Sequence, residues 1–141
     1  MSLFRYIYDF TNFFFGDIIS TNGGVFMENL LGLIEPMKNM DFNGFVYDGS
    51  YVGYPFVVYD FEKALYDSPI NDPNYVSNMI SHGWWDTEKM INDIPKMTAS
   101  EIGTCLTAIF RKERFVSGTI EKLLKSNVIF MLLEHLKKGY R

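Results

Sequence analysis

A run of apolar residues at helical spacing between Thr98 and Leu136 constrains the fold more than any other part of the chain. At its start, Thr98 and Glu101 have the spacing of a capping box, in which each side chain accepts a hydrogen bond from the other residue's amide. The apolar residues that follow recur at intervals of three and four and share one helical face: Ile102, Cys105, Leu106, Ile109 and Phe110. The sequence predicts a helix that begins at Thr98 and ends in the basic run at 111–114, because cations are favourable in a last helical turn.

Two shorter helices are predicted after this one. Gly118 supplies a flexible junction, and Ser117 can cap the helix that follows. Asn127, between the two helices, tolerates the left-handed geometry of a helix end. Their apolar faces consist of Ile120, Leu123 and Leu124, and of Ile129, Leu132, Leu133 and Leu136. Three amphipathic helices joined by short turns must pack on each other or on the rest of the chain.

Residues 42–59 are the part of the chain that favours strands. Asp48-Gly49, between two short aromatic and β-branched runs, is a strong signal for a two-residue hairpin turn. Pro55 has no N–H, so we place it at a strand start or a sheet edge. Residues 56–59 read as a further, buried strand. We therefore predict an α+β fold, mainly α-helical with a small antiparallel hairpin or sheet, that forms one domain over residues 1–141.

The other segments before Thr98 predict helices, because their apolar residues also recur at helical spacing. Residues 2–15 favour a helix over a strand, although their aromatic residues also suit a strand. A second helix, which Asn22 can cap, carries apolar residues from Val25 to Ile34, and Pro36 ends or kinks it. Three more helix starts are predicted at acidic residues that can cap a helix: Asp60, Asp72 and Asp86.

Two motifs in this chain resemble those of a known family. The first reads Arg-x-Glu-Arg-Phe-x-x-Gly and consists of Arg111, Glu113, Arg114, Phe115 and Gly118. The second, aromatic-Pro-aromatic-Val-Val-Tyr, covers residues 54–59. With these motifs, residues 37–136 resemble a family of small, mainly bacterial proteins of unknown function. The resemblance bears on the fold and implies no activity.

The composition indicates a globular chain with many aromatic residues. Of the 141 residues, 48% are hydrophobic and 17% are aromatic, which is enough for a core and too apolar for a disordered chain. The single cysteine, Cys105, lies on an apolar helix face, where we expect a buried and inert thiol. We see no secretion signal and no apolar run long enough to cross a membrane. We therefore expect a cytoplasmic protein with no membrane partner.

The charges are unevenly distributed along the chain. The net charge of −4 divides into −8 for residues 1–97 and +4 for residues 98–141. Such asymmetry can mark an acidic and a basic face, or it can draw the two segments together during folding. We favour the second interpretation, because +4 over three helices is modest for a nucleic-acid-binding protein.

A basic cluster at Arg111, Lys112 and Arg114 is one candidate site. Arginine matches carboxylate and phosphate groups through paired hydrogen bonds, so the cluster can bind an anion. The alternative, which we favour, is structural. In that case Arg114 ties the helix junction to backbone carbonyls or to an acidic residue among the first 97.

An aromatic group provides a second candidate site. Trp84 and Trp85, with Tyr51, Tyr54 and Tyr59, can line a ligand pocket or stack on bases. The alternative, again favoured, is that these rings fill the space between the hairpin and the helices.

No familiar catalytic motif is present in the sequence, and we expect no cofactor. His82 and His135 lie far apart and outside any metal-binding pattern, so we expect no metal. The leading hypothesis is a non-enzymatic interaction or regulatory protein that associates with itself or with another protein through apolar surface. The alternatives are a nucleic-acid-associated regulator that uses the basic C-terminal helices, and an enzyme with an unrecognised site.

Overall fold

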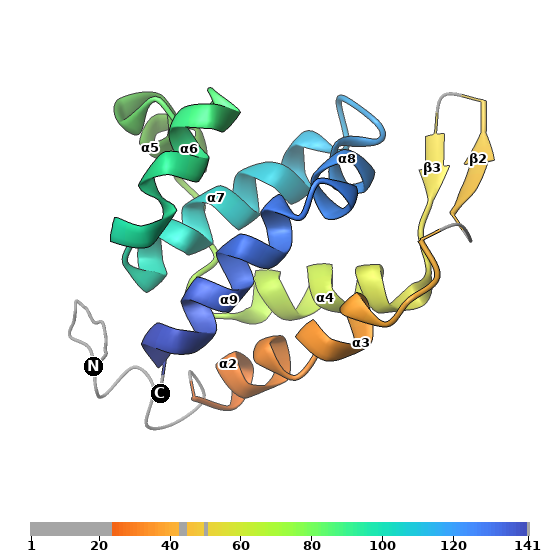
Figure 1. Ribbon diagram of the computed structural model, residues 1–141, viewed down its shortest axis with the longest axis horizontal. Coiled ribbons are helices and arrows are strands. Elements are labelled where there is room, and N and C mark those ends of the chain that lie inside the picture. The colour runs from red at the N-terminus through yellow and green to blue at the C-terminus, as the bar shows by residue number, and fades with distance from the viewer. Residues whose placement is uncertain (1–23, 43–44, 50, 141) are drawn as a thin grey trace.

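A computed structural model describes residues 24–42, 45–49 and 51–140, and shows helices around one long central helix, with a two-stranded hairpin at one end (Figure 1). The predicted helix over residues 2–15 lies outside the described residues. The elements in chain order are α2 (Gly24–Leu31), α3 (Ile34–Lys38), β2 (Val46–Asp48), β3 (Tyr51–Gly53), α4 (Phe56–Asp67), α5 (Tyr75–His82), α6 (Thr87–Asp93), a 3₁₀ turn η2 (Ile94–Lys96), α7 (Ala99–Lys112), α8 (Thr119–Lys125) and α9 (Val128–Tyr140).

Helix α7 is the centre of the structure, and its start confirms the predicted capping box. The amide of Glu101 donates to Thr98 Oγ1 at 3.2 Å, and the amide of Thr98 donates to Glu101 Oε1 at 2.9 Å. Every residue from 102 to 110 is buried, because α4, α5, α8 and α9 all contact this helix. The sequence predicted burial of one apolar face only, and it therefore underestimated how much of the helix is buried, since the small residues between the apolar positions are also buried.

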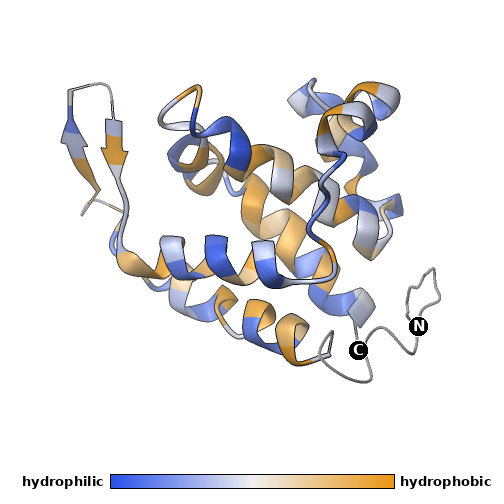
Figure 2. Ribbon diagram, turned by 180° about the vertical axis from the view of Figure 1, so that it is seen from behind, coloured by the Kyte–Doolittle hydropathy of each residue, from blue (hydrophilic) through white to orange (hydrophobic). Residues whose placement is uncertain are grey.

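Hydrophobic residues are concentrated along the helices at the centre of the body, whereas α4 shows alternating hydrophobic and hydrophilic bands (Figure 2). The fully buried side chains include residues from α2, α3, α4, α7, α8 and α9, so a single core joins the helices. Helices α8 and α9 follow the predicted pattern, and Asn127 between them has the expected positive φ of 73°. Within the described ranges, no helix has the length and apolar character that crossing a membrane requires.

The hairpin is shorter than predicted and its turn is displaced. Strands β2 and β3 pair antiparallel, with Tyr47 opposite Val52 and Asp48 opposite Tyr51. Asp48 therefore belongs to a strand and is not a turn residue, while Gly49 has a φ of 62°, as a tight turn requires. The pair stands beside α8 at the edge of the helical body (Figure 1).

The strand predicted over residues 56–59 is wrong, because these residues form the first turn of α4. Pro55 precedes the helix with an extended backbone, φ −56° and ψ 152°, instead of starting a strand. Val58, Phe61 and Leu65 then repeat at helical spacing and all three are buried. Burial of this face outweighs the strand preference of the local aromatic and β-branched residues. Asp60, predicted to cap a helix, lies inside α4.

Other helix starts agree with the sequence to different degrees. Asp86 caps α6 as predicted, accepting from the amides of Glu88 and Lys89. Helix α5 begins at Tyr75, later than the predicted start at Asp72. The Asp72 carboxylate instead accepts hydrogen bonds from the amide of Asn74, from Asn78 and from the Thr104 hydroxyl of α7. It therefore joins two helices. Pro36 lies within α3, after α2 has already ended.

Candidate functional site

A single carboxylate, that of Glu113, organises the junction between α7 and α8. Its Oε2 accepts from the amide of Gly118 at 2.8 Å, and its Oε1 accepts from the amide of Ile120 at 2.8 Å. These amides belong to the start of α8, where backbone N–H groups have no partner within the helix. Gly118 takes the left-handed conformation, with a φ of 93°, that turns the chain back into α8. Glu113 therefore acts as a cap from outside the helix.

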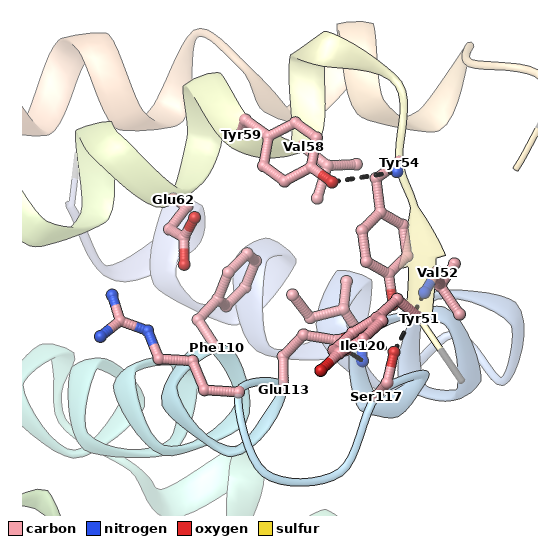
Figure 3. Close-up of a pocket in the computed structure, with 11 residues that line it drawn as sticks. Tyr51, Val52, Tyr54, Val58, Tyr59, Glu62, Phe110, Glu113, Ser117 and Ile120 are labelled. Carbon is pink, nitrogen blue, oxygen red and sulfur yellow. Dashed lines mark hydrogen bonds between the residues drawn. The ribbon is translucent and has the colours of Figure 1, made fainter. Parts of the chain in front are cut away.

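The same carboxylate connects the junction to the hairpin. The Tyr54 hydroxyl, just after β3, donates to Glu113 Oε1 at 2.9 Å and accepts from the amide of Glu121 at 3.1 Å. Ser117 Oγ lies 3.4 Å from Glu113 Oε2 and accepts from the amide of Val52 at 3.0 Å (Figure 3). We call Glu113 and these partners the Glu113 network: Val52, Tyr54, Ser117, Gly118, Ile120 and the Glu121 amide.

Tyr54 is held in its neutral form by this arrangement. Its side chain is buried, and burial raises the pKa of its hydroxyl well above the ordinary value of 10.0, as do the carboxylates of Glu113 and Glu121. A neutral hydroxyl can donate to Glu113 while it accepts from the Glu121 amide. The network therefore needs a protonated tyrosine, and its surroundings ensure one.

The exposed side of the hairpin is attached to α8 by a second carboxylate. Tyr47 donates its hydroxyl to Glu121, and Lys125 Nζ lies 2.8 Å from Glu121 Oε2. Two hydrogen bonds lower the pKa of the Glu121 carboxyl: the one from Lys125 has the larger effect, and the one from Tyr47 has the smaller.

A cavity of about 270 Å³ lies between α4, the hairpin and the α7–α8 junction, next to the Glu113 network. The side chains in Figure 3 come from all of these elements and surround it: Tyr51, Val52, Tyr54, Val58, Tyr59, Glu62, Phe110, Glu113, Arg114, Ser117 and Ile120. Tyr59 lies across the cavity from Glu113, and its hydroxyl accepts from the Tyr54 amide at 3.2 Å. This cavity, with aromatic and charged walls, is the candidate site.

The structure divides all but one of the predicted site residues between two cavities. Tyr54, Tyr59 and Arg114 line the cavity described above. Trp84, Trp85 and Lys112 line a separate cavity of only about 40 Å³, which has little room beyond one water molecule.

The members of the second group make structural contacts. The buried Trp84 indole donates to Asp93 Oδ2 at 2.9 Å. Lys112 Nζ lies 5.8 Å from the ring centroid of Trp85, within the range of a cation–π contact. Arg111 lies over the ring of Tyr66 at 4.4 Å and lines neither cavity. The sequence alone could not show which of the predicted site residues line the candidate cavity, because their neighbours in the fold come from distant parts of the chain.

The structural role expected of Arg114 belongs to Glu113. Within the described part of the chain, Arg114 forms no hydrogen bond and no ion pair, and its side chain is exposed. Glu113 was matched to the family motif but not singled out as a structural residue. The spacing of Glu113 and Gly118 in the sequence could have indicated this role, because a carboxylate five residues before a glycine that starts a helix can reach that helix's free amides.

The ion pairs between the two oppositely charged segments do not have the predicted direction. Among the described residues, Lys38 pairs with Glu134 across these segments, and His82 Nε2 lies 3.5 Å from Glu101 Oε2, a contact that is an ion pair only when the histidine is protonated. In both, the basic partner lies in the acidic segment. Direct contacts between C-terminal cations and N-terminal carboxylates therefore do not hold the described segments together.

The described residues contain no cluster of three or more histidine, cysteine or acidic side chains that could hold a metal ion. Cys105 is buried, as predicted, and burial raises the pKa of its thiol to about 12. A thiol with this pKa is protonated at neutral pH and is a poor nucleophile.

The fold and the site define a helical domain whose last helices hold a hairpin and an aromatic cavity. Comparison with known families agrees with the resemblance seen in the sequence. Residues 29–141 match the Family of unknown function (DUF6508), and the chain belongs to this family. No curated protein and no solved structure matches the chain.

Proposed function

We propose that this chain is a non-enzymatic interaction domain, which binds a second copy of itself or another protein through apolar surface around the hairpin. The observation that carries the proposal is the exposure of large aromatic side chains there: 85% for Phe56, 82% for Phe115 and 72% for Tyr51. We use the name hairpin face for the exposed apolar side chains of the hairpin, of the start of α4 and of the α7–α8 loop: Val46, Tyr47, Tyr51, Phe56, Tyr59, Phe115 and Val116.

Exposed aromatic residues are enriched in the cores of protein interfaces, where they supply much of the binding energy. Those of the hairpin face come from the hairpin, the start of α4 and the α7–α8 loop. The Glu113 network joins the hairpin to the α7–α8 loop, and the Tyr59 hydroxyl of α4 accepts from the Tyr54 amide, so the segments that carry the rings are held together before a partner arrives. Such preorganisation lowers the entropic cost of binding. We further propose that the protein acts in the cytoplasm, which suits a single buried thiol.

The test compares Phe115→Asp with Ile80→Asp. Ile80 is a matched control, because it is 64% exposed on α5 and outside the hairpin face. Sedimentation velocity over a concentration series measures self-association, and affinity capture from a native lysate recovers protein and nucleic acid. Circular dichroism confirms that both variants are folded.

A dimer or a captured protein that is retained by Ile80→Asp and lost in Phe115→Asp supports the proposal. A protein that stays monomeric and captures no protein contradicts it. Capture of nucleic acid that weakens steeply with salt, in wild type and both variants, points instead to the basic C-terminal helices.

A further inference from the structure

The candidate cavity has an apolar floor and a charged rim. Its floor consists of Val58, Phe110 and Ile120, which are all buried. Its rim includes Glu62 and Arg114, which carry opposite charges. At about 270 Å³, the cavity is slightly below the range of about 300–1,000 Å³ that is typical of drug-sized ligands. A ligand that matches the size and the polarity of this cavity is small, with one apolar end and one charged end.

The two rim charges line the same cavity, and they form no ion pair with each other. Glu62 Oε2 accepts from the Tyr66 hydroxyl at 3.2 Å, and the other carboxylate oxygen accepts nothing from the described residues. Arg114 has no polar partner among these residues either. Burial raises the pKa of the Tyr66 hydroxyl, the Glu62 carboxylate raises it further, and Arg111 and Arg114 lower it, so both rim charges act on this hydroxyl. One anion and one cation are thus available on one rim.

The other polar groups of the cavity differ in what they can offer a ligand. Glu113 is already saturated, because both of its oxygens accept hydrogen bonds within the Glu113 network. The Tyr59 hydroxyl accepts from the Tyr54 amide but donates to no described residue, so its hydrogen remains available. In Figure 3 the rings of Tyr54 and Tyr59 border the same space as Phe110. The cavity therefore offers one carboxylate, one guanidinium, one hydroxyl donor and aromatic walls.

We propose that this cavity binds a free α-amino acid with a large apolar side chain. The ammonium group faces Glu62, and the carboxylate faces Arg114. The apolar side chain lies on the floor between the tyrosine rings. A zwitterion uses both rim charges, whereas an anion alone leaves Glu62 facing a like charge and a cation alone does the same to Arg114. The site adjoins the hairpin face, since Tyr51 and Tyr59 belong to both, but the proposal does not rest on the interaction function and has a separate readout.

Isothermal titration calorimetry with L-phenylalanine and L-leucine tests this proposal on the full chain. Two analogues separate the charges: 3-phenylpropionate lacks the ammonium group, and phenethylamine lacks the carboxylate. The variants are Glu62→Gln and Arg114→Gln, with Glu88→Gln and Lys137→Gln as exposed controls on α6 and α9. Each rim variant should weaken L-phenylalanine binding at least about tenfold, as expected for the loss of a charge-assisted hydrogen bond.

The analogues give the sharper result. Glu62→Gln should strengthen 3-phenylpropionate binding, because it removes a like charge, and Arg114→Gln should strengthen phenethylamine binding for the same reason. The proposal is overturned if neither amino acid binds at millimolar concentration, or if both rim variants bind L-phenylalanine as the wild type does. Because the readout is a small-molecule titration, its failure leaves the capture experiment at the hairpin face unaffected.

Discussion

The two ends of α7 are joined to their neighbours by the same chemistry but with different packing. Near the start of the helix, the Asp72 carboxylate accepts from Thr104 Oγ1 at 2.6 Å and from Asn78 Nδ2 at 2.7 Å. At its end, the Glu113 carboxylate accepts from two amides and a tyrosine hydroxyl. At the Asp72 junction, the backbone around Ile70 lies directly against Gly103. The Glu113 junction borders a cavity and an exposed aromatic surface.

The difference shows how one helix can serve both stability and binding. Close backbone contact at the Asp72 junction buries small residues, with Thr104 and Thr107 both almost fully covered. Such contact tolerates little change, because a packed interior has no room for added atoms. The Glu113 junction holds its elements through hydrogen bonds around a space that is not filled. We therefore expect substitutions at the first junction to affect mainly stability, and substitutions at the second to affect stability less and binding more.

The largest effect is expected for Gly103→Ala. A Cβ atom at this position would lie 2.0 Å from the carbonyl oxygen of Ile70 and 2.6 Å from its Cβ, so the backbone must move. We expect a loss of about 3 kcal/mol or more in the free energy of unfolding, measured by urea denaturation. Gly139→Ala in α9 is the control, since nothing lies within 4 Å and alanine favours a helix. Equal stability of the two variants would contradict the close packing described here.

A smaller loss is expected for Glu113→Ala. The substitution leaves the amides of Gly118 and Ile120 and the Tyr54 hydroxyl without their acceptor. We expect about 2 kcal/mol less stability in urea denaturation, because solvent can replace some of these bonds in a partly exposed site. Glu88→Ala, at an exposed position on α6, should change stability by no more than about 0.5 kcal/mol. A loss at Glu113 as large as that of Gly103→Ala would erase the contrast between the junctions.

A smaller loss of stability than for Glu113→Ala, and one that depends on pH, is expected for Glu121→Gln. The folded protein lowers the pKa of Glu121 below its ordinary value of 4.5, so the ionised carboxylate stabilises the fold above that pH. The contribution is lost as the pH falls through the folded-state pKa. The advantage of wild type over the variant in urea midpoint should therefore shrink between about pH 6 and about pH 3.

The effect of salt on stability provides an independent test of whether the charge of Glu121 stabilises the fold. The ion pair with Lys125 lies near the surface, so about 1 M salt should reduce the difference at neutral pH. A difference that stays constant with both pH and salt would show that the charge of Glu121 does not stabilise the hairpin.

The smallest effect on stability is expected for Arg114→Ala. The exposed guanidinium has no polar partner among the described residues, so the unfolding free energy should change by no more than about 0.5 kcal/mol. Thermal unfolding measures this directly. A clear drop in melting temperature would restore the structural role that the sequence suggested for this arginine, and would weaken its assignment to the cavity rim.

Local signals predicted the helices well. The capping box at Thr98 and Glu101, the cap at Asp86 and the left-handed residue Asn127 each depend on neighbours within a few positions. Residues 56–59 were misread for the opposite reason. Their local preference is for a strand, and burial of the helical face that begins at Val58 against distant helices decides the outcome.

The candidate site was predictable only in part. Tyr54, Tyr59 and Arg114 were singled out as residue types that bind ligands, and all three line the cavity. Their association with Glu62 and Phe110 depends on how α4 packs against α7, which no short motif encodes. The wide spacing of Trp84, Trp85 and the tyrosines along the chain likewise gave no indication that they line different cavities.

The hydrogen bonds that hold the hairpin connect residues between 59 and 74 positions apart. A two-stranded hairpin is at best marginally stable by itself, so β2 and β3 should open without unfolding of the helices. Their amide hydrogens should exchange with solvent faster than those of α7. Tyr51 and Val52 form part of the cavity wall, so each such opening also dismantles the cavity. A ligand bound there must therefore slow exchange in strands that it barely touches, in proportion to the occupancy of the site.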